Sequence, residues 1–394
     1  MTGILANAEA DVIEAVRAAR ESRRTLEIVG GGTKRAYGRA APCDDVLDVS
    51  RLSGVVNYEP EELVLTVKSG TPVAEIDALL GSKSQCLGFE PADWGPLLDA
   101  PARASTIAGV LSADANGPAA VRYGRARDSL LGYRAVNGLA EAYKAGGRVV
   151  KNVTGFDLPK LMCGAFGTLG VLTEVTLRVF PKPSDAAVLI VRDISAAEGL
   201  TLLRTIWSSP LEATGLCYVP AAATSAALGE IQKGAALIRL EGAPEPLREK
   251  IEGAKALLGE RAQTLGIEIF SRIGDGAIFL GRDLDVWRVF VPPAEAAKLV
   301  AAIQSPLWFA DWAGGLLWIG MLPGNDGARL RHIIEPVGGH TTLLRAATET
   351  RGRVDVFQPE TPARGALTRS VKAAFDPLGL FNPGRMWREE KEAV

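Results

Sequence analysis

Residues 26–34 read LEIVGGGTK, a β-type run that leads directly into the consecutive glycines Gly30, Gly31 and Gly32. Glycine has no Cβ and adopts positive φ readily, so the backbone N–H groups of such a turn can all point at one anion. Thr33 adds a hydroxyl group and Lys34 a positive charge. The stretch therefore predicts a phosphate-binding loop at the end of a strand. For the glycine triplet considered alone, a plain tight turn is the alternative.

The loop matches neither of the two common nucleotide-binding glycine motifs. It lacks the G-x-G-x-x-G spacing, and the sequence Gly-Lys-Ser/Thr of a P-loop occurs nowhere in the chain. A nucleotide-binding site formed by this loop would therefore belong to another class of fold.

Further glycine-rich segments follow the loop. Residues 104–118 are rich in small residues and carry hydroxyl and amide groups that could line a sugar-phosphate, and Arg122-Tyr123-Gly124 comes soon after. Residues 151–157 precede glycines spaced three apart, at 164, 167 and 170. Close packing of a helix on a sheet would by itself explain that last triplet. Several such segments in one region nevertheless favour a long ligand over a single phosphate.

Composition narrows the class of protein. The 394 residues include 44 basic and 46 acidic side chains, a net charge of -2, so nucleic acid is not expected as a partner. The four cysteines lie far apart, which predicts neither a disulfide framework nor a zinc or iron–sulfur site, and no metal is expected. The N-terminus does not resemble a signal peptide, and the most apolar window, residues 314–322, is too short to cross a bilayer. A cytoplasmic protein is expected, with membrane association only through partner subunits.

The order of elements predicts separate domains. Before Pro181-Lys182-Pro183 the chain is irregular and glycine-rich, and after it strands and amphipathic helices alternate as two βαββαβ-like units with an antiparallel sheet. Helices are expected at residues 8–22, 72–80, 196–206, 246–258, 294–303, 327–334 and 366–375. Strands are expected at residues 26–29, 46–49, 55–58, 63–67, 170–180, 187–191, 215–219, 236–240, 287–291, 315–321 and 341–344.

Taken together, these segments resemble the FAD-binding domain of the vanillyl-alcohol-oxidase, or PCMH-type, flavoprotein superfamily. Residues 375–385, which end in Asn382-Pro383-Gly384-Arg385, are similar to the closing motif of its FAD-linked oxidase branch. Within that branch the short chain, the Gly-Gly-Gly-Thr-Lys loop and Val286-Trp287-Arg288 look most like the family of FAD-binding E subunits of glycolate oxidase.

The resemblance implies an α+β architecture. A PCMH-type FAD-binding domain of two α/β subdomains would span residues 1–183. A ferredoxin-like α/β cap domain with an antiparallel sheet would span residues 184–365, and residues 366–394 would return to the flavin. It also implies a function, in which the chain holds FAD for electron transfer in a complex that oxidises glycolate to glyoxylate. The implied partners are a catalytic flavoprotein subunit and an iron–sulfur subunit.

Carried over by position, the resemblance implies which residues hold the cofactor. Residues 30–34 would wrap the pyrophosphate, and a second wall would come from residues 105–114. The segment 170–172 would meet the adenine half, and Asn382 with Arg385 would approach the isoalloxazine ring. The expected cofactor-binding residues beyond the loop are Ser105, Thr106, Gly109, Ser112, Asp114, Arg122, Tyr123, Gly155, Gly170, Val171, Leu172, Asn382 and Arg385.

The chain carries few residues for substrate chemistry. Its only histidines are His332, expected on a helix surface, and His340, at a strand start. Covalent attachment of FAD in this family uses a histidine or cysteine of the FAD domain. Because no histidine precedes residue 332, noncovalent FAD is expected, with attachment through a cysteine as the alternative. Catalytic relatives carry a motif resembling His-x-Gly-Asp-Gly-Asn-x-His, whereas the nearest string here, residues 272–279, reads RIGDGAIF. Its Gly-Asp-Gly is either the counterpart of that motif or a common turn. No catalytic residue is therefore assigned, and a partner is expected to act on the substrate.

Two other functions stay open. One is an independent FAD-dependent oxidoreductase that acts on a 2-hydroxy acid or an alcohol, and the other is a structural subunit without flavin. The apolar cluster Trp308, Phe309, Trp312, Leu316, Leu317 and Trp318 is expected to form core, with a partner-binding face as the alternative.

Overall fold

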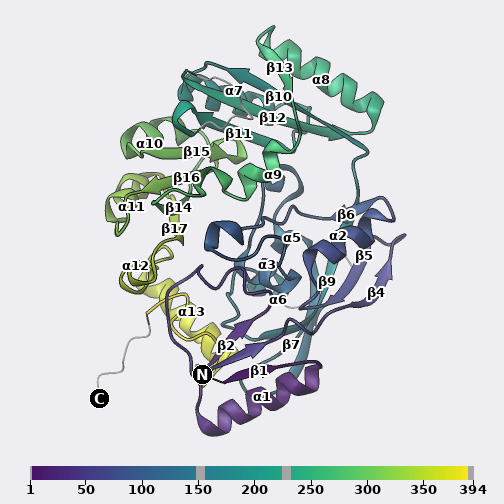
Figure 1. Ribbon diagram of the computed structural model, residues 1–394, viewed down its shortest axis with the longest axis vertical. Coiled ribbons are helices and arrows are strands. Elements are labelled where there is room, and N and C mark those ends of the chain that lie inside the picture. Colours follow the sequence, from purple (N-terminus) through teal and green to yellow (C-terminus); the bar gives the residue numbers. More distant parts are fainter. Residues whose placement is uncertain (1, 148–155, 224–231, 389–394) are drawn as a thin grey trace. The chain divides into compact units, whose positions relative to one another are not determined.

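The computed structural model describes residues 2–147, 156–223 and 232–388, which divide into two compact units (Figure 1). Unit 1 comprises residues 1–115, 125–181 and 355–394. Unit 2 comprises residues 116–124 and 182–354. The chain therefore leaves unit 1 and returns to it twice.

A small parallel sheet begins unit 1. Its strands, in the order β1-β3-β2 among the described residues, are β1 (Gly3–Leu5), β3 (Asp45–Asp48) and β2 (Leu26–Val29). Helix α1 (Glu9–Ser22) buries Val12 and Val16 in a core that also contains Leu47 and Phe381. The side chain of Asp11 accepts hydrogen bonds from the N–H groups of residues 7 and 8 and so caps the start of this helix.

A larger antiparallel sheet completes unit 1. Over the described residues its strands run in the order β4-β5-β9-β7-β8, and β6 pairs with β9. They are β4 (Val55–Glu59), β5 (Val64–Lys68), β6 (Gln85–Leu87), β7 (Leu130–Val136), β8 (Ala142–Gly146) and β9 (Val171–Pro181). The helices of this unit include α2 (Val73–Gly81), α3 (Ile107–Ala113), α5 (Ala126–Ser129), α6 (Leu158–Met162) and α13 (Pro362–Phe375). The sequence does not predict β7 and β8, because β8 is largely exposed and both lie among small residues.

Unit 2 confirms the predicted repeat of two βαββαβ units. The first consists of β10 (Asp185–Arg192), α7 (Ala196–Trp207), β11 (Gly215–Pro220), β12 (Gly234–Gly242), α8 (Pro244–Leu258) and β13 (Ala262–Leu265). The second consists of β14 (Asp285–Phe290), α10 (Ala296–Ile303), β15 (Leu307–Asp311), β16 (Leu316–Met321), α11 (Ala328–Ile334) and β17 (His340–Arg345). Three short helices lie outside the repeat: α4 (Ala120–Tyr123), α9 (Ile269–Gly274) and α12 (Thr348–Arg353).

The two halves of unit 2 share one sheet. In the described part of the chain it has eight antiparallel strands in the order β13-β10-β12-β11-β15-β16-β14-β17. Helices α8, α7, α10 and α11 contact one another in that order, so they form a continuous helical layer (Figure 1). Short antiparallel pairings thus join two ferredoxin-like halves into one layered unit.

The tryptophan-rich cluster is mainly core, as expected. Phe309, Leu317 and Trp318 are almost completely buried in β15 and β16. Trp308 and Trp312 are half-buried: Trp308 stacks on Tyr218, and the Trp312 Nε1 donates a hydrogen bond to the carbonyl oxygen of Gly117. A search of the described residues finds no helix long and apolar enough to span a membrane.

Candidate functional site

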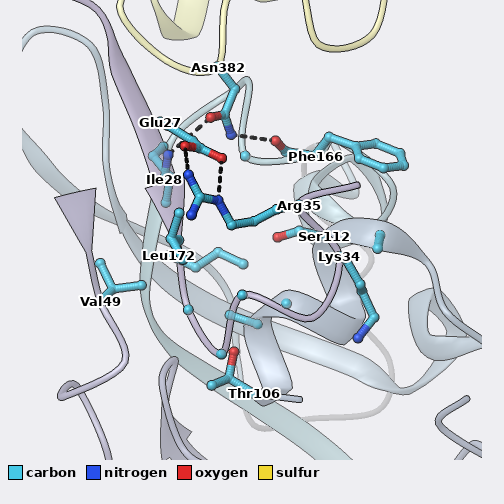
Figure 2. A pocket seen from close by; sticks show the side chains of 18 of the residues that line it. Glu27, Ile28, Lys34, Arg35, Val49, Thr106, Ser112, Phe166, Leu172 and Asn382 are labelled. Atoms are coloured by element: carbon cyan, nitrogen blue, oxygen red, sulfur yellow. Dashed lines mark hydrogen bonds and ion pairs between the residues drawn. The ribbon is translucent and has the colours of Figure 1, made fainter. Parts of the chain in front are cut away.

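An open cavity in unit 1 lies where β2 ends and α3 begins (Figure 2). It encloses about 770 Å³, its open mouth included. Its walls consist of Glu27, Ile28, Val29, Gly30, Gly31, Gly32, Thr33, Lys34, Arg35, Val49, Thr106, Ala108, Gly109, Ser112, Ala113, Phe166, Gly167, Gly170, Leu172, Asn382 and Arg385. Segments from the start, the middle and the far end of the chain therefore meet around one space.

The surroundings and backbone conformation of the glycine loop disfavour a side chain at Gly30, Gly31 or Gly32. A Cβ on Gly31 would lie 1.8 Å from the carbonyl oxygen of Ala104, and one on Gly30 would lie 2.4 Å from the Oγ1 of Thr106. Gly32 adopts a φ of 71°, which side chains disfavour. Among the described residues, none accepts a hydrogen bond from the backbone N–H groups of these three glycines. The loop thus presents donors to the cavity that an anionic ligand would satisfy.

Lys34 places a positive charge beside these donors. Its side chain is largely buried, and the Nζ donates to the Oγ of Ser105 at 2.9 Å and to the Oγ1 of Thr33 at 3.1 Å. The two hydroxyl oxygens are themselves 3.1 Å apart. A buried ammonium group held by neutral hydroxyls still attracts an anion strongly, because little water screens it. Lys34 and the N–H groups together suit a phosphate group.

The C-terminal segment closes the opposite side of the cavity. The Oδ1 of Asn382 accepts a hydrogen bond from the Ile28 N–H at 3.0 Å, and its Nδ2 donates to the carbonyl oxygen of Phe166 at 2.7 Å (Figure 2). The Nη2 of Arg385 donates to the carbonyl oxygen of Lys34 at 2.8 Å. The segment therefore connects the strand before the glycine loop to the loop itself.

A buried ion pair shapes this segment. Lys372 and Asp376 lie one helical turn apart at the end of α13, and the Asp376 carboxylate accepts hydrogen bonds from the N–H groups of Leu380 and Phe381. The Lys372 Nζ also donates to the carbonyl oxygens of Thr168 and Phe381. These contacts fix the turn that delivers Asn382 to the cavity.

Sequence reasoning missed an ion pair in the cavity wall. The Arg35 Nε donates to the Oε1 of Glu27 at 2.9 Å, and this hydrogen bond raises the pKa of Arg35 (Figure 2). Phe166 was also missed, and its ring contacts Tyr37 edge-on. The sequence shows only that Glu27 and Arg35 stand on either side of the glycine loop. Whether their side chains form an ion pair depends on how the loop folds back.

The structure brings most of the expected cofactor residues together, but not all. The residues that line the cavity are Gly30, Gly31, Gly32, Thr33, Lys34, Thr106, Gly109, Ser112, Gly170, Leu172, Asn382 and Arg385. Ser105 lies behind them and bonds Lys34, and Val171 is buried in β9. Asp114 forms an ion pair with Arg125 at 3.0 Å.

Of the remaining expected residues, two belong to unit 2 and one is not described. Arg122 and Tyr123 belong to unit 2, where Arg122 pairs with Glu212 and the Tyr123 hydroxyl lies 3.1 Å from Glu241. Gly155 lies outside the described residues.

Comparison with known proteins indicates which cofactor similar proteins bind. The family model described as FAD binding domain matches residues 4–146. Two solved structures resemble the fold: a p-cresol methylhydroxylase with substrate bound (TM-score 0.73, 15% identity, 98% of this chain and 88% of that chain) and a 4-ethylphenol oxidase from Gulosibacter chungangensis (TM-score 0.70, 16% identity, 98% and 89%). Fold and family model thus define an FAD-binding protein with the fold of the PCMH-type flavoproteins.

The relatives specify the family. The glycolate oxidase subunit GlcE of Escherichia coli is 31% identical over 96% of this chain and 97% of that protein. The glycolate oxidase subunit GlcD of Bacillus subtilis is 31% identical over 43% of this chain and 37% of that protein. The chain belongs to the family of the glycolate oxidase subunit GlcE.

The residues of the cavity fit FAD. The unsatisfied N–H groups of Gly30 to Gly32 and the ammonium of Lys34 suit a pyrophosphate, and glycine is required there by its close neighbours. Val49 and Leu172 give the wall apolar surface that suits a ring. The wall therefore combines both kinds of surface that a dinucleotide with a large ring system needs.

Proposed function

We propose that this chain is the FAD-holding subunit of a complex that oxidises glycolate to glyoxylate, and that it works beside a catalytic flavoprotein subunit and an iron–sulfur subunit. The observation that carries the proposal is the match to GlcE, which extends over 96% of this chain and 97% of the relative. A relative of that extent shares both units, so the likeness is not limited to the cofactor domain.

Within unit 1, the chain's own residues would divide the cofactor between them. The loop from Gly30 to Lys34 would bind the pyrophosphate through backbone N–H groups and one ammonium group. Thr106 and Ser112 would hold the sugar-like chain with their hydroxyl groups, and Asn382 would shape the wall at the opposite side. FAD, when bound, accepts and passes on electrons. The task of the protein is then to bind the cofactor, orient it and limit its contact with water.

Noncovalent binding is part of the proposal. Both histidines of the chain, His332 and His340, lie in unit 2. Cys43 is partly buried, and this burial raises the pKa of its thiol to about 11. Since the thiolate is the nucleophile, a thiol that stays protonated at neutral pH is poorly suited to attach the flavin. Burial raises the pKa of Cys163 as well. Acid precipitation should release the whole flavin into the supernatant.

Unit 2 supports a division of labour between subunits. No cluster of three or more His, Cys, Asp or Glu suited to a metal occurs among the described residues. His332 and His340 are exposed, and the His340 ring stacks on Phe290 at 4.5 Å. Residues 272–279, the string nearest to the histidine motif of catalytic relatives, end α9 and form a short turn without histidine. A partner subunit would supply the groups that act on the substrate.

The visible spectrum of the purified chain tests the proposal. The chain should carry flavin absorbance that glycolate bleaches only slowly or not at all, and bleaching should become rapid once the partner subunits are added. Rapid reduction by glycolate alone would instead establish an independent dehydrogenase. A chain that stays colourless after incubation with FAD would point to a structural subunit and remove the proposal.

A further inference from the structure

A second cavity lies entirely in unit 2 and takes no part in the proposed cofactor site. It encloses about 700 Å³, its open mouth included. Two of its lining residues are the arginines Arg272 and Arg282, and the others are apolar. The apolar lining consists of Val219, Ala223, Ile269, Ile273, Ala277, Ile278, Leu280 and Leu307. The cavity thus has a hydrocarbon floor with two cationic groups in its wall.

Helix α9 is fixed in place and so positions the first arginine. The Phe270 ring packs on Gly215 so closely that a Cβ on this glycine would lie 2.5 Å from the ring. The guanidinium of Arg239, a residue of β12, lies 5.1 Å from the centre of the same ring. Ile273 is 2% exposed and lines the cavity. With one side of the helix held in this way, Arg272 is presented from a rigid support.

The turn that carries the second arginine is held just as firmly. Arg345, at the end of β17, donates hydrogen bonds to three carbonyl oxygens of this turn: Phe279 at 2.9 Å, Arg282 at 2.7 Å and Leu284 at 2.8 Å. Charge-assisted bonds of this kind are stronger than neutral ones. The backbone of Arg282 is therefore ordered, although its side chain reaches solvent.

No described residue that lines the cavity carries a negative charge to compensate the two arginines. Over the part of the chain that the structure describes, neither guanidinium forms an ion pair or a side-chain hydrogen bond, and no acidic side chain lines the cavity. Two positive groups above an apolar floor match a ligand with one anionic end and one hydrocarbon end.

We propose that this cavity of unit 2 binds a small carboxylate with an apolar body, its carboxylate at Arg272 and Arg282 and its hydrocarbon chain against Ile269, Ile273 and Leu307. Carboxylate recognition by two guanidinium groups gives orientation as well as affinity. The apolar walls favour longer hydrocarbon chains, because each methylene that leaves water adds to the affinity.

Calorimetric titration of the FAD-loaded full chain with octanoate tests the proposal. Octanoate should bind at one site per chain, and 1-octanol, which has the same body without the charge, should bind at least tenfold more weakly. R272Q and R282Q should each weaken octanoate binding by about tenfold. R248Q removes another exposed arginine of unit 2 and should change nothing.

Other outcomes would overturn the site. Equal binding of octanoate and 1-octanol would remove the anion-binding role, and unchanged binding in the R272Q/R282Q double variant would remove the location. A277W fills the cavity and should abolish binding, while its melting temperature shows whether the fold survives. Because the cavity is confined to unit 2, a G31A variant that has lost FAD should still bind octanoate. Failure of this proposal can thus be told apart from failure of the proposed function.

Discussion

Asn382 and Ile28, which are 354 residues apart in the sequence, are joined by a hydrogen bond of 3.0 Å from the Ile28 N–H to the Asn382 carboxamide. The backbone N–H of Asn382 donates in turn to the carbonyl oxygen of Leu26, and Phe381 pairs with Leu26 in parallel. The C-terminal segment therefore extends the edge of the small sheet. It does so at the strand that delivers the glycine loop.

N382A should loosen this connection. The substitution leaves the partly buried Ile28 N–H without its acceptor and the Phe166 carbonyl without its donor, which should cost about 2–4 kcal/mol of stability. Asn382 also has a φ of 43°, which alanine tolerates less well. Thermal unfolding and the FAD content after gel filtration should both decrease. L378A, at an exposed position of the same segment, should leave both unchanged.

G31A should remove FAD binding with little effect elsewhere. The new methyl group would overlap the carbonyl oxygen of Ala104, 1.8 Å away, so the loop has to move and its N–H groups lose their common direction. Fluorescence titration of the apoprotein with FAD should show at least a tenfold loss of affinity. G81A is the matched control, since a Cβ at Gly81 meets nothing within 4 Å. Equal FAD affinity of the two variants would contradict a role of the loop in binding.

K34M should weaken FAD binding by about 10- to 100-fold, because it removes a charged donor from a largely buried position. The affinity of the unmodified protein should also fall as salt concentration rises, and this dependence should be smaller in K34M. K83M, which removes an exposed lysine of unit 1, serves as the control. A salt dependence that K34M leaves unaltered would argue against contact between Lys34 and the pyrophosphate.

Glu9 should make the stability of unit 1 sensitive to acid. Hydrogen bonds from Arg134, the larger effect, and from Thr173 lower the pKa of Glu9 below its usual value of 4.5, although burial opposes them. The carboxylate therefore stabilises the folded state fully above about pH 4.5, and this contribution is lost as the pH falls through the lowered pKa.

The E9Q variant tests this expectation. E9Q should lower the melting temperature at pH 7, by an amount equivalent to about 0.5–1 kcal/mol, because Arg134 is partly exposed. The difference from the unmodified protein should shrink below pH 4. E14Q removes a more exposed carboxylate of the same helix, paired with Arg17, and should have almost no effect at either pH. A constant difference across this range would disprove the titration.

Local patterns predict much of this fold. The regular alternation after Pro183 predicts the repeat of two βαββαβ units and most of their elements, but the strands β13 and β15 are not among those expected. The β-type run before Gly30 likewise predicts β2 and the loop. The pairing of β7 and β8 is not predicted, since their register depends on β9, which follows only after residue 170.

Long-range packing accounts for the rest. Residues 116–124 belong to unit 2, where Tyr123 reaches Glu241, although they directly follow the segment that carries Ser112. No property of a nine-residue segment indicates such a partner. The Glu27–Arg35 pair is missed for a similar reason: the two residues are close in sequence, but only the shape of the loop between them brings their side chains together.

The return of the C-terminal segment to β2 also determines when the cofactor can be captured. During synthesis the glycine loop leaves the ribosome early, whereas Asn382 and Arg385, which complete the cavity wall, are added more than three hundred residues later. Until they are added, the parallel sheet of unit 1 lacks the C-terminal segment that pairs with β2. FAD loading is thus expected to be a late event in biogenesis, and a ribosome-stalled chain that lacks this segment should not retain the flavin.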